Sequence, residues 1–259
     1  MTPRTAAADT WTITLRSLAH WARQPGPVAV ALLFPVMVAL MMGYLFGGQM
    51  DVPGGGGYRE FIMPGMFAMT MLFGVETTFA AVASDRARGV TDRFRAMPVA
   101  PSAPVAGRAV ADMLHGAVAL AVMIGCGLLV GWRWHDGAGR ALAGLGLLLL
   151  LRFALVWTGV YLGLVASGPE AVVVAQVLVW PVGFLSSALI APETMPGWLG
   201  AIAEWNPLSA TVTACRDLFG DTAPSGGWAA DHALALAVVW PLLISGVFAV
   251  LSVRRYGRR

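Results

Sequence analysis

Apolar residues along this chain are grouped into six runs, each about as long as a helix needs to cross a lipid bilayer. Short polar segments, or segments rich in glycine and proline, separate the runs. The runs lack the two-residue alternation of barrel strands, and a helix satisfies its own backbone hydrogen bonds in lipid. The pattern therefore predicts an all-α fold with six membrane-spanning helices. The predicted spans are residues 28–47, 61–83, 109–131, 141–165, 171–191 and 232–253.

A shorter helical pattern precedes the first span, within residues 9–23. Large apolar side chains recur there every three or four positions, at Trp11, Leu15, Leu18 and Trp21. Because arginines fall on the other faces, the pattern predicts an amphipathic helix in the membrane interface, with a frayed tail as the alternative. The predicted domains are an N-terminal segment (1–27), a membrane domain (28–253) and a basic tail (254–259).

The composition agrees with a membrane protein. Hydrophobic residues make up 58% of the 259-residue chain and charged residues 12%, and the mean hydropathy is +0.71. An ordinary soluble domain carries about 25% charged residues, so much of this surface must face lipid. The chain is therefore predicted to be a multi-pass membrane protein.

The distribution of basic side chains predicts the orientation. All 17 Lys and Arg residues are arginines. If the N-terminus is inside the cell, twelve arginines fall in inner segments, four in outer loops and Arg152 within a span. Because cytoplasmic loops carry an excess of basic residues, both termini are predicted to be cytoplasmic, in the inner (plasma) membrane. The absence of lysine beside abundant alanine, glycine and arginine is typical of a GC-rich bacterial genome.

The segment of residues 84–100 is strongly basic for this chain. It contains four arginines: Arg86, Arg88, Arg93 and Arg95. Anionic lipid headgroups alone would hold such a loop in place, at about 1 kcal/mol for each arginine near the surface. The segment also carries an apolar stripe, because Val90, Phe94 and Met97 recur at helical spacing before Pro98. The stripe predicts docking either into lipid or into the groove of a soluble partner.

Two blocks of sequence resemble a known family. The first is YREFIMPGMFAMTMLFG (58–74) with SDRARGVTDRFRAMPVAPSAPVAGRAVADML (84–114), and the second is PVGFLSSALIAPETMPGWLGAIAEWNPLSATVTACRDLFG (181–220). Both are similar to the permease subunits of the ABC-2 transporter family, nearest to the daunorubicin/doxorubicin-resistance type of drug exporter. In the second block the matching positions are Pro192, Pro196, Trp198, Asn206, Pro207 and Arg216. The resemblance covers nearly the whole chain and does not specify a substrate.

This resemblance implies an exporter in which two six-span permeases pair with two ATP-binding subunits. It also implies that a cytoplasmic helix between the second and third spans carries motion from the ATPase to the membrane, and residues 84–98 occupy that position. We therefore expect Phe94, with Val90 and Met97, to enter the ATPase surface. The arginines expected to meet acidic groups beside it are Arg88, Arg93 and Arg95.

The loop between the last two predicted spans, residues 192–231, is long and acidic. Asn206 can cap a helix whose first residue is Pro207, where the missing N–H costs nothing. One face of that helix would contain Leu208, Val212, Cys215 and Phe219. We expect this face to enter the outer leaflet or to cover the exit of the bundle; a plain surface loop is the alternative. By resemblance the loop closes an outer gate, with Pro196, Trp198, Asn206, Pro207 and Phe219 as candidate residues.

Ionisable residues within spans are costly and are therefore functional candidates. Glu76 and Arg152 are the two in this sequence, with Gln176 as a polar residue in the fifth predicted span. Three roles are open: the three side chains line a transport path, Glu76 and Arg152 pair with each other across helices, or they lie at a dimer seam.

No catalytic or metal-binding pattern is present. A P-loop needs a lysine after its glycines, and the sequence has none. The histidines are scattered, without an HExxH or a Gly-x-Ser-x-Gly motif, and the two cysteines are far apart. Asp112 and His115 share a helix face, an arrangement that is usually structural. We therefore predict a permease that is not an enzyme and binds no cofactor, with ATP and Mg on the partner subunit.

The predicted function is that of the permease subunit of an ATP-driven exporter of a hydrophobic or amphiphilic small molecule. The predicted partners are an ATP-binding subunit, a second permease copy and membrane lipid, with no nucleic acid. One alternative is a proton-coupled secondary transporter without an ATPase, in which Glu76 or Asp112 would relay protons. A membrane scaffold without a transport path is the other.

Overall fold

The computed structural model describes residues 3–23, 25–47, 57–90, 103–166, 170–221 and 227–257. Within these ranges the structure is helical and has no strand, which confirms the predicted all-α fold. The long helices are α1 (Pro3–Arg23), α2 (Pro25–Met41) with a π-helical turn (Met42–Phe46), α3 (Tyr58–Ala87), α5 (Ala103–Val130), α6 (Gly137–Val165), α7 (Glu170–Phe184) and α11 (Ala233–Gly257). The short ones are a 3-10 turn (Pro192–Thr194), α8 (Gly197–Glu204), α9 (Pro207–Phe219) and α10 (Trp228–Asp231).

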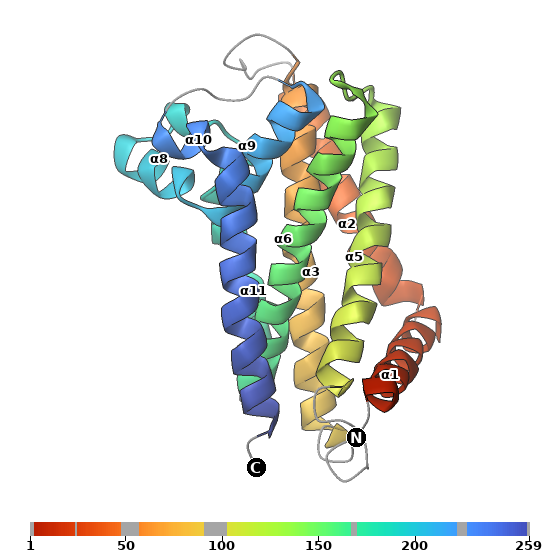
Figure 1. The fold of residues 1–259 in the computed structure, drawn as a ribbon. Helices are drawn as coiled ribbons and strands as arrows, with labels where there is room; N and C mark the ends of the chain where they lie inside the picture. The colour runs from red at the N-terminus through yellow and green to blue at the C-terminus, as the bar shows by residue number, and fades with distance from the viewer. Residues whose placement is uncertain are drawn as a thin grey trace.

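Figure 1 shows a bundle of long helices that stand side by side. The tilted helix α1 lies beside one end of the bundle, where α11 also finishes, and the short helices α8, α9 and α10 lie at the other. We call these the α1 end and the α9 end. The two ends of the chain therefore lie at the same end of the bundle.

Five helical segments of the described residues are long and apolar enough to cross a membrane. They are Pro25–Leu45, Tyr58–Ala87, Ala103–Val130, Gly137–Val165 and Ala233–Tyr256, and they overlap five of the six predicted spans. The remaining prediction, residues 171–191, falls on α7, which has only 15 residues. At 1.5 Å per residue α7 is about 22 Å long, short of the roughly 30 Å hydrocarbon core. The count of six spans is therefore not confirmed.

Helix α3 runs through the centre of the bundle and is the most buried of the five segments. Its side chains from Phe61 to Phe73 are buried, including four methionines. Methionine side chains are flexible enough to fill irregular gaps between helices, and Met66 and Met69 lie in the core without exposed surface. The apolar residues of α3 therefore contact neighbouring helices instead of lipid.

Close packing of α3 on α6 depends on two glycines spaced four residues apart. A methyl group at Gly159 would lie 3.0 Å from the side chain of Thr78, and one at Gly163 would lie 2.7 Å from Val82. Small residues at this spacing let two helix backbones approach closely in a membrane. The two helices therefore form one tightly packed pair along this seam.

Helix α1 packs against α5, as Figure 1 also shows. The Thr14 hydroxyl donates to the carbonyl oxygen of Gly107 at 3.1 Å, and Ile13 is buried in the same contact. The predicted apolar face is exposed at Trp11 and Leu15, whereas Leu18 and Trp21 are partly buried. An exposed apolar face on a helix beside the bundle is what an interfacial helix requires, so the interfacial position of α1 stays a prediction.

Candidate functional site

A pocket of about 570 Å³ lies among α2, α3, α5, α6 and α7. Its wall is mainly apolar and includes three aromatic rings that contact one another: Phe34, Phe73 and Trp180. The polar side chains in the wall are Thr70, Glu76, Thr77, His115 and Arg152. Two of the three intramembrane residues that the sequence singled out, Glu76 and Arg152, therefore border the same cavity. The third, Gln176, is exposed on α7 and is not part of this wall.

The predicted ion pair between Glu76 and Arg152 is not among the salt bridges of the described residues. Glu76 is partly buried, whereas Arg152 has no exposed surface. The Arg152 guanidinium donates to three oxygens: the Met71 carbonyl at 3.4 Å, the Thr78 hydroxyl at 3.2 Å and the Asp112 carbonyl at 3.5 Å. Arg152 thus joins α6 to α3 and α5, whereas Glu76 lines the pocket.

Two glycines provide the space that the Arg152 side chain occupies. A methyl group at Gly74 of α3 would lie 2.2 Å from the Arg152 Nη1, and one at Gly116 of α5 would lie 2.8 Å from its Cγ. No larger residue fits at either position unless the arginine moves. Both glycines also border the pocket, so the arginine and the two glycines beside it belong to the same part of the pocket wall.

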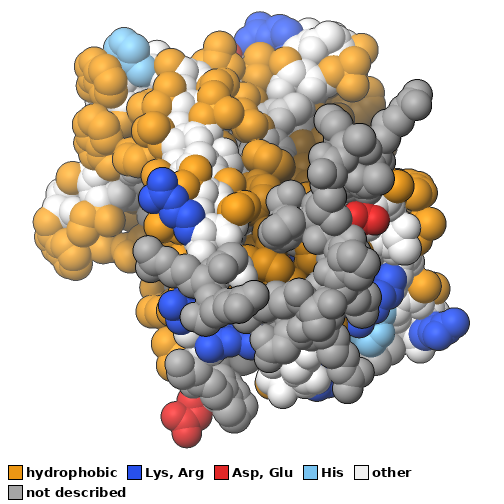
Figure 2. All heavy atoms as spheres, turned by 60° about the horizontal axis from the view of Figure 1, so that its bottom comes forward, with side chains coloured by type: hydrophobic (Ala, Val, Ile, Leu, Met, Phe, Trp, Pro, Cys, Tyr) orange, Lys and Arg blue, Asp and Glu red, His pale blue; other side chains and the backbone are white. Residues whose placement is uncertain are grey.

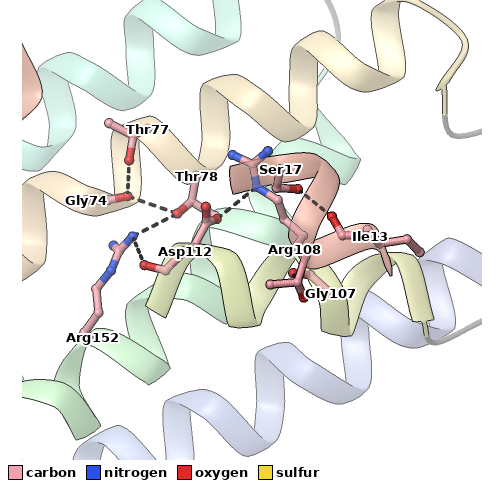
Figure 3. A network of polar contacts seen from close by, with 10 residues as sticks. Ile13, Ser17, Gly74, Thr77, Thr78, Gly107, Arg108, Asp112 and Arg152 are labelled. Carbon is pink, nitrogen blue, oxygen red and sulfur yellow. Dashed lines mark hydrogen bonds and ion pairs between the residues drawn. The ribbon is translucent and has the colours of Figure 1, made fainter. Parts of the chain in front are cut away.

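A chain of polar contacts leads from Arg152 toward α1 (Figure 3). Asp112 makes two of these contacts. Its backbone carbonyl accepts from Arg152, and its carboxylate pairs with Arg108, with 3.1 Å between Arg108 Nε and Asp112 Oδ2. Asp112 is buried, and a buried carboxylate needs such a partner. One turn earlier on α5, Gly107 accepts from Thr14 of α1. The predicted structural role of Asp112 is therefore supported by its contacts.

His115 is a residue of the pocket wall that sequence reasoning did not include among the candidate site residues. It lines the pocket and its ring lies 4.7 Å from the ring of Trp21 on α1, centroid to centroid. The only available signal was its spacing of three residues from Asp112, which is too common to indicate a site. Contact between α1 and the pocket wall could not be read from the sequence, because it depends on how α1 packs on α5.

Most of the predicted ATPase-docking segment lies outside the described residues, including Arg93, Phe94, Arg95 and Met97. Two of the candidate contact residues, Arg88 and Val90, are described. Arg88 is exposed and pairs with Asp85 one turn earlier at 3.3 Å. Val90 lines a small groove at the α1 end, between α1, α3 and α5. Figure 2 looks onto this end of the molecule and shows basic side chains gathered there. The exposed arginines of the described residues at this end are Arg16, Arg23, Arg86, Arg88, Arg254 and Arg255.

At the α9 end, the predicted cap of α9 is confirmed. Asn206 accepts from the Leu208 N–H at 2.9 Å, and Pro207 is the first residue of the helix. The amide of the same side chain donates to the carbonyl oxygens of Val182 and Leu185, at 3.0 and 2.6 Å. Asn206 therefore begins α9 and also satisfies carbonyls at the end of α7, which lets α7 stop after Phe184.

The predicted apolar face of α9 is buried, as expected for a helix that covers the bundle. Leu208, Val212, Cys215 and Phe219 have almost no exposed surface. The Phe219 ring lies 5.1 Å from the ring of Trp132, and both contact Phe67 of α3. Of the other candidate gate residues, Trp198 is 70% exposed on α8 and Pro196 is the residue before that helix. Among the five gate candidates Phe219 is therefore buried, Asn206 and Pro207 are partly buried, and Pro196 and Trp198 are exposed.

Arg216 is the residue of this region whose contacts sequence reasoning missed. It has no exposed surface, and its guanidinium lies 3.7 Å from the centre of the Phe61 ring. It donates to the carbonyl oxygens of Phe61 at 3.1 Å, Ser187 at 2.9 Å and Ala188 at 3.4 Å. Burial lowers the pKa of Arg216 to about 9, although the nearby Asp221 carboxylate opposes this shift. A single arginine thus binds the turn after α7 to the first turn of α3.

Comparison with known proteins agrees with this architecture. Residues 8–219 match the family described as ABC-2 type transporter. The chain is 35% identical over 97% of its length, and 87% of the relative's, to the daunorubicin resistance ABC transporter permease protein DrrB1 of Streptomyces coeruleorubidus. It is 25% identical over 82% of its length, and 77% of the relative's, to a probable doxorubicin resistance ABC transporter permease protein of Mycobacterium tuberculosis.

The protein belongs to the ABC-2 type transporter family. It is a multi-pass membrane permease whose relatives are permease subunits of ABC transporters. In such transporters the ATPase is a separate subunit, and no enzymatic activity is indicated for this chain. The resemblance to ABC-2 permeases that the sequence indicated is therefore confirmed.

Proposed function

We propose that this chain is the permease subunit of an ATP-driven exporter and that the 570 Å³ pocket is part of its cargo path. The observation that carries the proposal is a drug-sized cavity between the membrane helices of an ABC-2 permease. The ATP-binding subunits and a second permease copy complete the transporter. The α1 end, with both chain termini, faces the cytoplasm.

The proposed cargo is an amphiphilic small molecule such as a drug, an antibiotic or a lipid-like compound. The rings of Phe34, Phe73 and Trp180 offer an apolar surface, and Glu76 offers one carboxyl group at its edge. A few polar groups in an apolar wall suit a molecule that has both characters. The names of the relatives refer to daunorubicin and doxorubicin resistance, so we take daunorubicin as the first cargo to test.

The proposed ATPase contact is the segment of residues 84–98 at the α1 end. Phe94, with Val90 and Met97, would enter a groove of the ATPase, and the arginines Arg88, Arg93 and Arg95 would meet acidic groups. The exposed position of Arg88 within this segment supports the proposal, because complementary charge promotes association. At the opposite end, α8 and α9 would form the outer gate, with Asn206 and Pro207 fixing the start of α9.

The test of this function is whether an ATPase accompanies the permease. Tagged protein is extracted from its native membranes in mild detergent, and the ATPase activity that co-purifies is measured for wild type and Phe94→Glu. We expect activity with wild type and its loss with Phe94→Glu. Ala22→Glu, which also places a carboxylate at an exposed apolar residue near the α1 end but outside the spans, is the control and should keep the activity. Wild-type preparations that retain their folded state but carry no ATPase would contradict the proposal.

The cargo is tested by uptake of daunorubicin into inside-out vesicles that contain the complex. Uptake should require ATP and should fall in Glu76→Gln, while Glu170→Gln, at the exposed start of α7, should leave it unchanged. Uptake that continues without ATP and stops when a proton gradient is collapsed would instead identify the secondary transporter. ATP hydrolysis without daunorubicin uptake would reject this cargo and leave the exporter function intact.

A further inference from the structure

One side chain, Arg86, joins the ends of α3 and α6 at the α1 end. It lies in the last turn of α3, and its Nη1 donates to the carbonyl oxygens of Leu164 at 3.0 Å and Ala166 at 2.6 Å. These acceptors are about eighty residues away along the chain. The contact is therefore a tertiary one, and it differs in kind from the local pair that Arg88 makes with Asp85.

The acceptors are chemically suited to an arginine. Helix α6 ends at Val165, so the carbonyls of its last turn have no partner further along the same helix. The C-terminus of a helix also carries partial negative charge, which favours a cation. Charge-assisted hydrogen bonds of this kind are about twice as strong as neutral ones. Arg86 thus acts as a side-chain cap for α6 that is supplied by α3.

The seam between α3 and α6 continues inward from this cap. Gly163 packs on Val82, and Gly159 packs on Thr78, with no room for a methyl group at either contact. Helices packed this closely move as a unit because their backbones interlock. A displacement applied to the end of α3 therefore reaches α6 along the whole seam.

The carbonyls that this cap binds come shortly before the start of α7 in the sequence. Ala166 accepts from Arg86, and α7 begins at Glu170, three intervening residues later in the sequence. Helix α7 carries Trp180, which forms part of the pocket wall together with Phe34 of α2 and Phe73 of α3. Arg86 therefore contacts the carbonyls at the end of α6, a few residues before the helix that bears one wall of the pocket.

We propose that Arg86 is a positioning residue for transport, which couples movement of the segment after α3 to the connection between α6 and α7 and so to the pocket wall. This inference rests on the proposed function, in which the ATPase acts on residues 84–98. Arg86 itself faces the α6 carbonyls instead of the ATPase. Its removal is therefore expected to leave the complex assembled and to impair the response of the pocket.

The experiment measures pocket access without knowledge of the cargo. Thr77, an exposed residue of the pocket wall, is changed to cysteine, and the rate of maleimide labelling is measured in the complex with its co-purified ATPase, with and without ATP and vanadate. The native Cys126 and Cys215 are buried, so the parent without Thr77→Cys gives the background. ATPase activity is recorded for every preparation.

Nucleotide should change the labelling rate of the Thr77→Cys complex by at least about fivefold, the lower end of typical coupling between sites. With Arg86→Gln added, the change should fall below about twofold while the ATPase stays bound and active. With Arg86→Lys it should be intermediate, because the shorter lysine side chain keeps the charge and has enough donors but does not reach the two carbonyls in the same geometry. Arg254→Gln, an exposed arginine near the same end of the bundle, is the control and should behave as the parent.

A response equal to that of the parent in Arg86→Gln and Arg86→Lys overturns the inference and leaves the proposed function standing. If the Arg86→Gln permease does not assemble with the ATPase, the test rests on Arg86→Lys. A nucleotide-dependent change in labelling equal to that of the parent in Arg86→Lys then overturns the inference. A parent preparation that carries no ATPase overturns the proposed function, and the role of Arg86 with it. Loss of the response with ATP hydrolysis retained supports the inference, since a merely structural role would impair both.

Discussion

The molecule contains two fully buried arginines, Arg152 at the centre of the bundle and Arg216 at the α9 end, and they are held differently. Arg152 contacts regular helices through one hydroxyl and two long hydrogen bonds to carbonyls, and glycines make room for it. Arg216 contacts the irregular turn after α7 and lies on the ring of Phe61. No salt bridge of the described residues involves either of them.

This difference shows what a buried guanidinium does in an apolar bundle. In regular helices most carbonyls already accept from their own helix, so an arginine finds few free acceptors and depends on space. Where a helix stops inside the structure, its last carbonyls need donors, and an arginine supplies several at once. Arg216 is therefore expected to matter more for stability than Arg152, and Arg152 more for the pocket.

The largest effect is expected for Arg216→Met, which keeps much of the side-chain volume and removes every donor. Carbonyls of Ser187 and Ala188 would then be buried without this partner, at a cost of about 3–5 kcal/mol. The midpoint of thermal unfolding in detergent should fall by about 10 °C. Arg140→Met, which removes an exposed arginine at the same end, is the control and should change the midpoint by less than about 3 °C.

A smaller loss is expected for Arg152→Met. Two of its three hydrogen bonds are 3.4 Å or longer, and Asp112 keeps its partner Arg108. We expect a cost of about 2 kcal/mol and a decrease of about 5 °C in the same unfolding experiment. A decrease larger than that of Arg216→Met would reverse the comparison between the two arginines.

Gly116→Ala tests whether space decides the position of Arg152. The new methyl group would lie 2.8 Å from Arg152 Cγ, so we expect a cost of about 1–2 kcal/mol. Gly125→Ala on the same helix meets nothing within 4 Å and should be neutral or slightly stabilising. In an Arg152→Met background the cost of Gly116→Ala should shrink. Equal costs in both backgrounds would mean that Gly116 does not serve Arg152.

The smallest effect concerns pH at the α9 end. Burial raises the pKa of Asp221 from 3.8 to about 6, and the negative charge of Glu60 adds to this shift. A hydrogen bond from Trp132 and the charges of His135 and Arg216 lower the pKa and oppose it. The folded protein therefore binds this proton more tightly than the unfolded chain does. The stabilising contribution is complete below about pH 4 and is lost as the pH rises through about 6.

The unfolding midpoint of wild type relative to Asp221→Asn should accordingly decrease by about 2–4 °C between pH 4 and pH 6 and then stay constant. His135→Gln removes the imidazole whose Nδ1 lies 3.9 Å from the Asp221 carboxylate. In that variant the decrease should remain, because burial is the main cause of the shift. A difference that rises with pH would show that Arg216 stabilises the ionised carboxylate more strongly than burial opposes it.

Local features of the sequence predicted much of the fold. The apolar runs gave five of the long helices, the Asn206–Pro207 pair gave the start of α9, and the spacing of its apolar residues gave the buried face. These predictions succeed because the signals act within a turn or two of helix. The fifth predicted span was too long, since the apolar run of residues 171–191 continues past the end of α7. Apolar composition does not show where a helix ends if a distant side chain satisfies its carbonyls.

The candidate site was predictable only as a set of residues. Glu76 and Arg152 were identified because charge within a span is costly, and both border the pocket. A salt bridge between them is not among those of the described residues, and Gln176 does not line the pocket. Phe94, the residue predicted to dock on the ATPase, lies outside the described residues. The role of an intramembrane charge depends on the acceptors that other helices bring to it, and one sequence does not contain that information.

The sequence by itself determined that this protein is a helical membrane protein, because length, hydropathy and local capping are properties of short stretches of chain. The resemblance of its two sequence blocks, and not these local properties, identified the ABC-2 family. The tertiary structure decided the partners of its buried arginines, the glycine-lined seam of α3 and α6, and the cavity beside Glu76. Arg216 and the Phe61 carbonyl are 155 residues apart in the sequence. Contacts of that range arise only when packing brings donors to carbonyls that have no other partner in a medium without water.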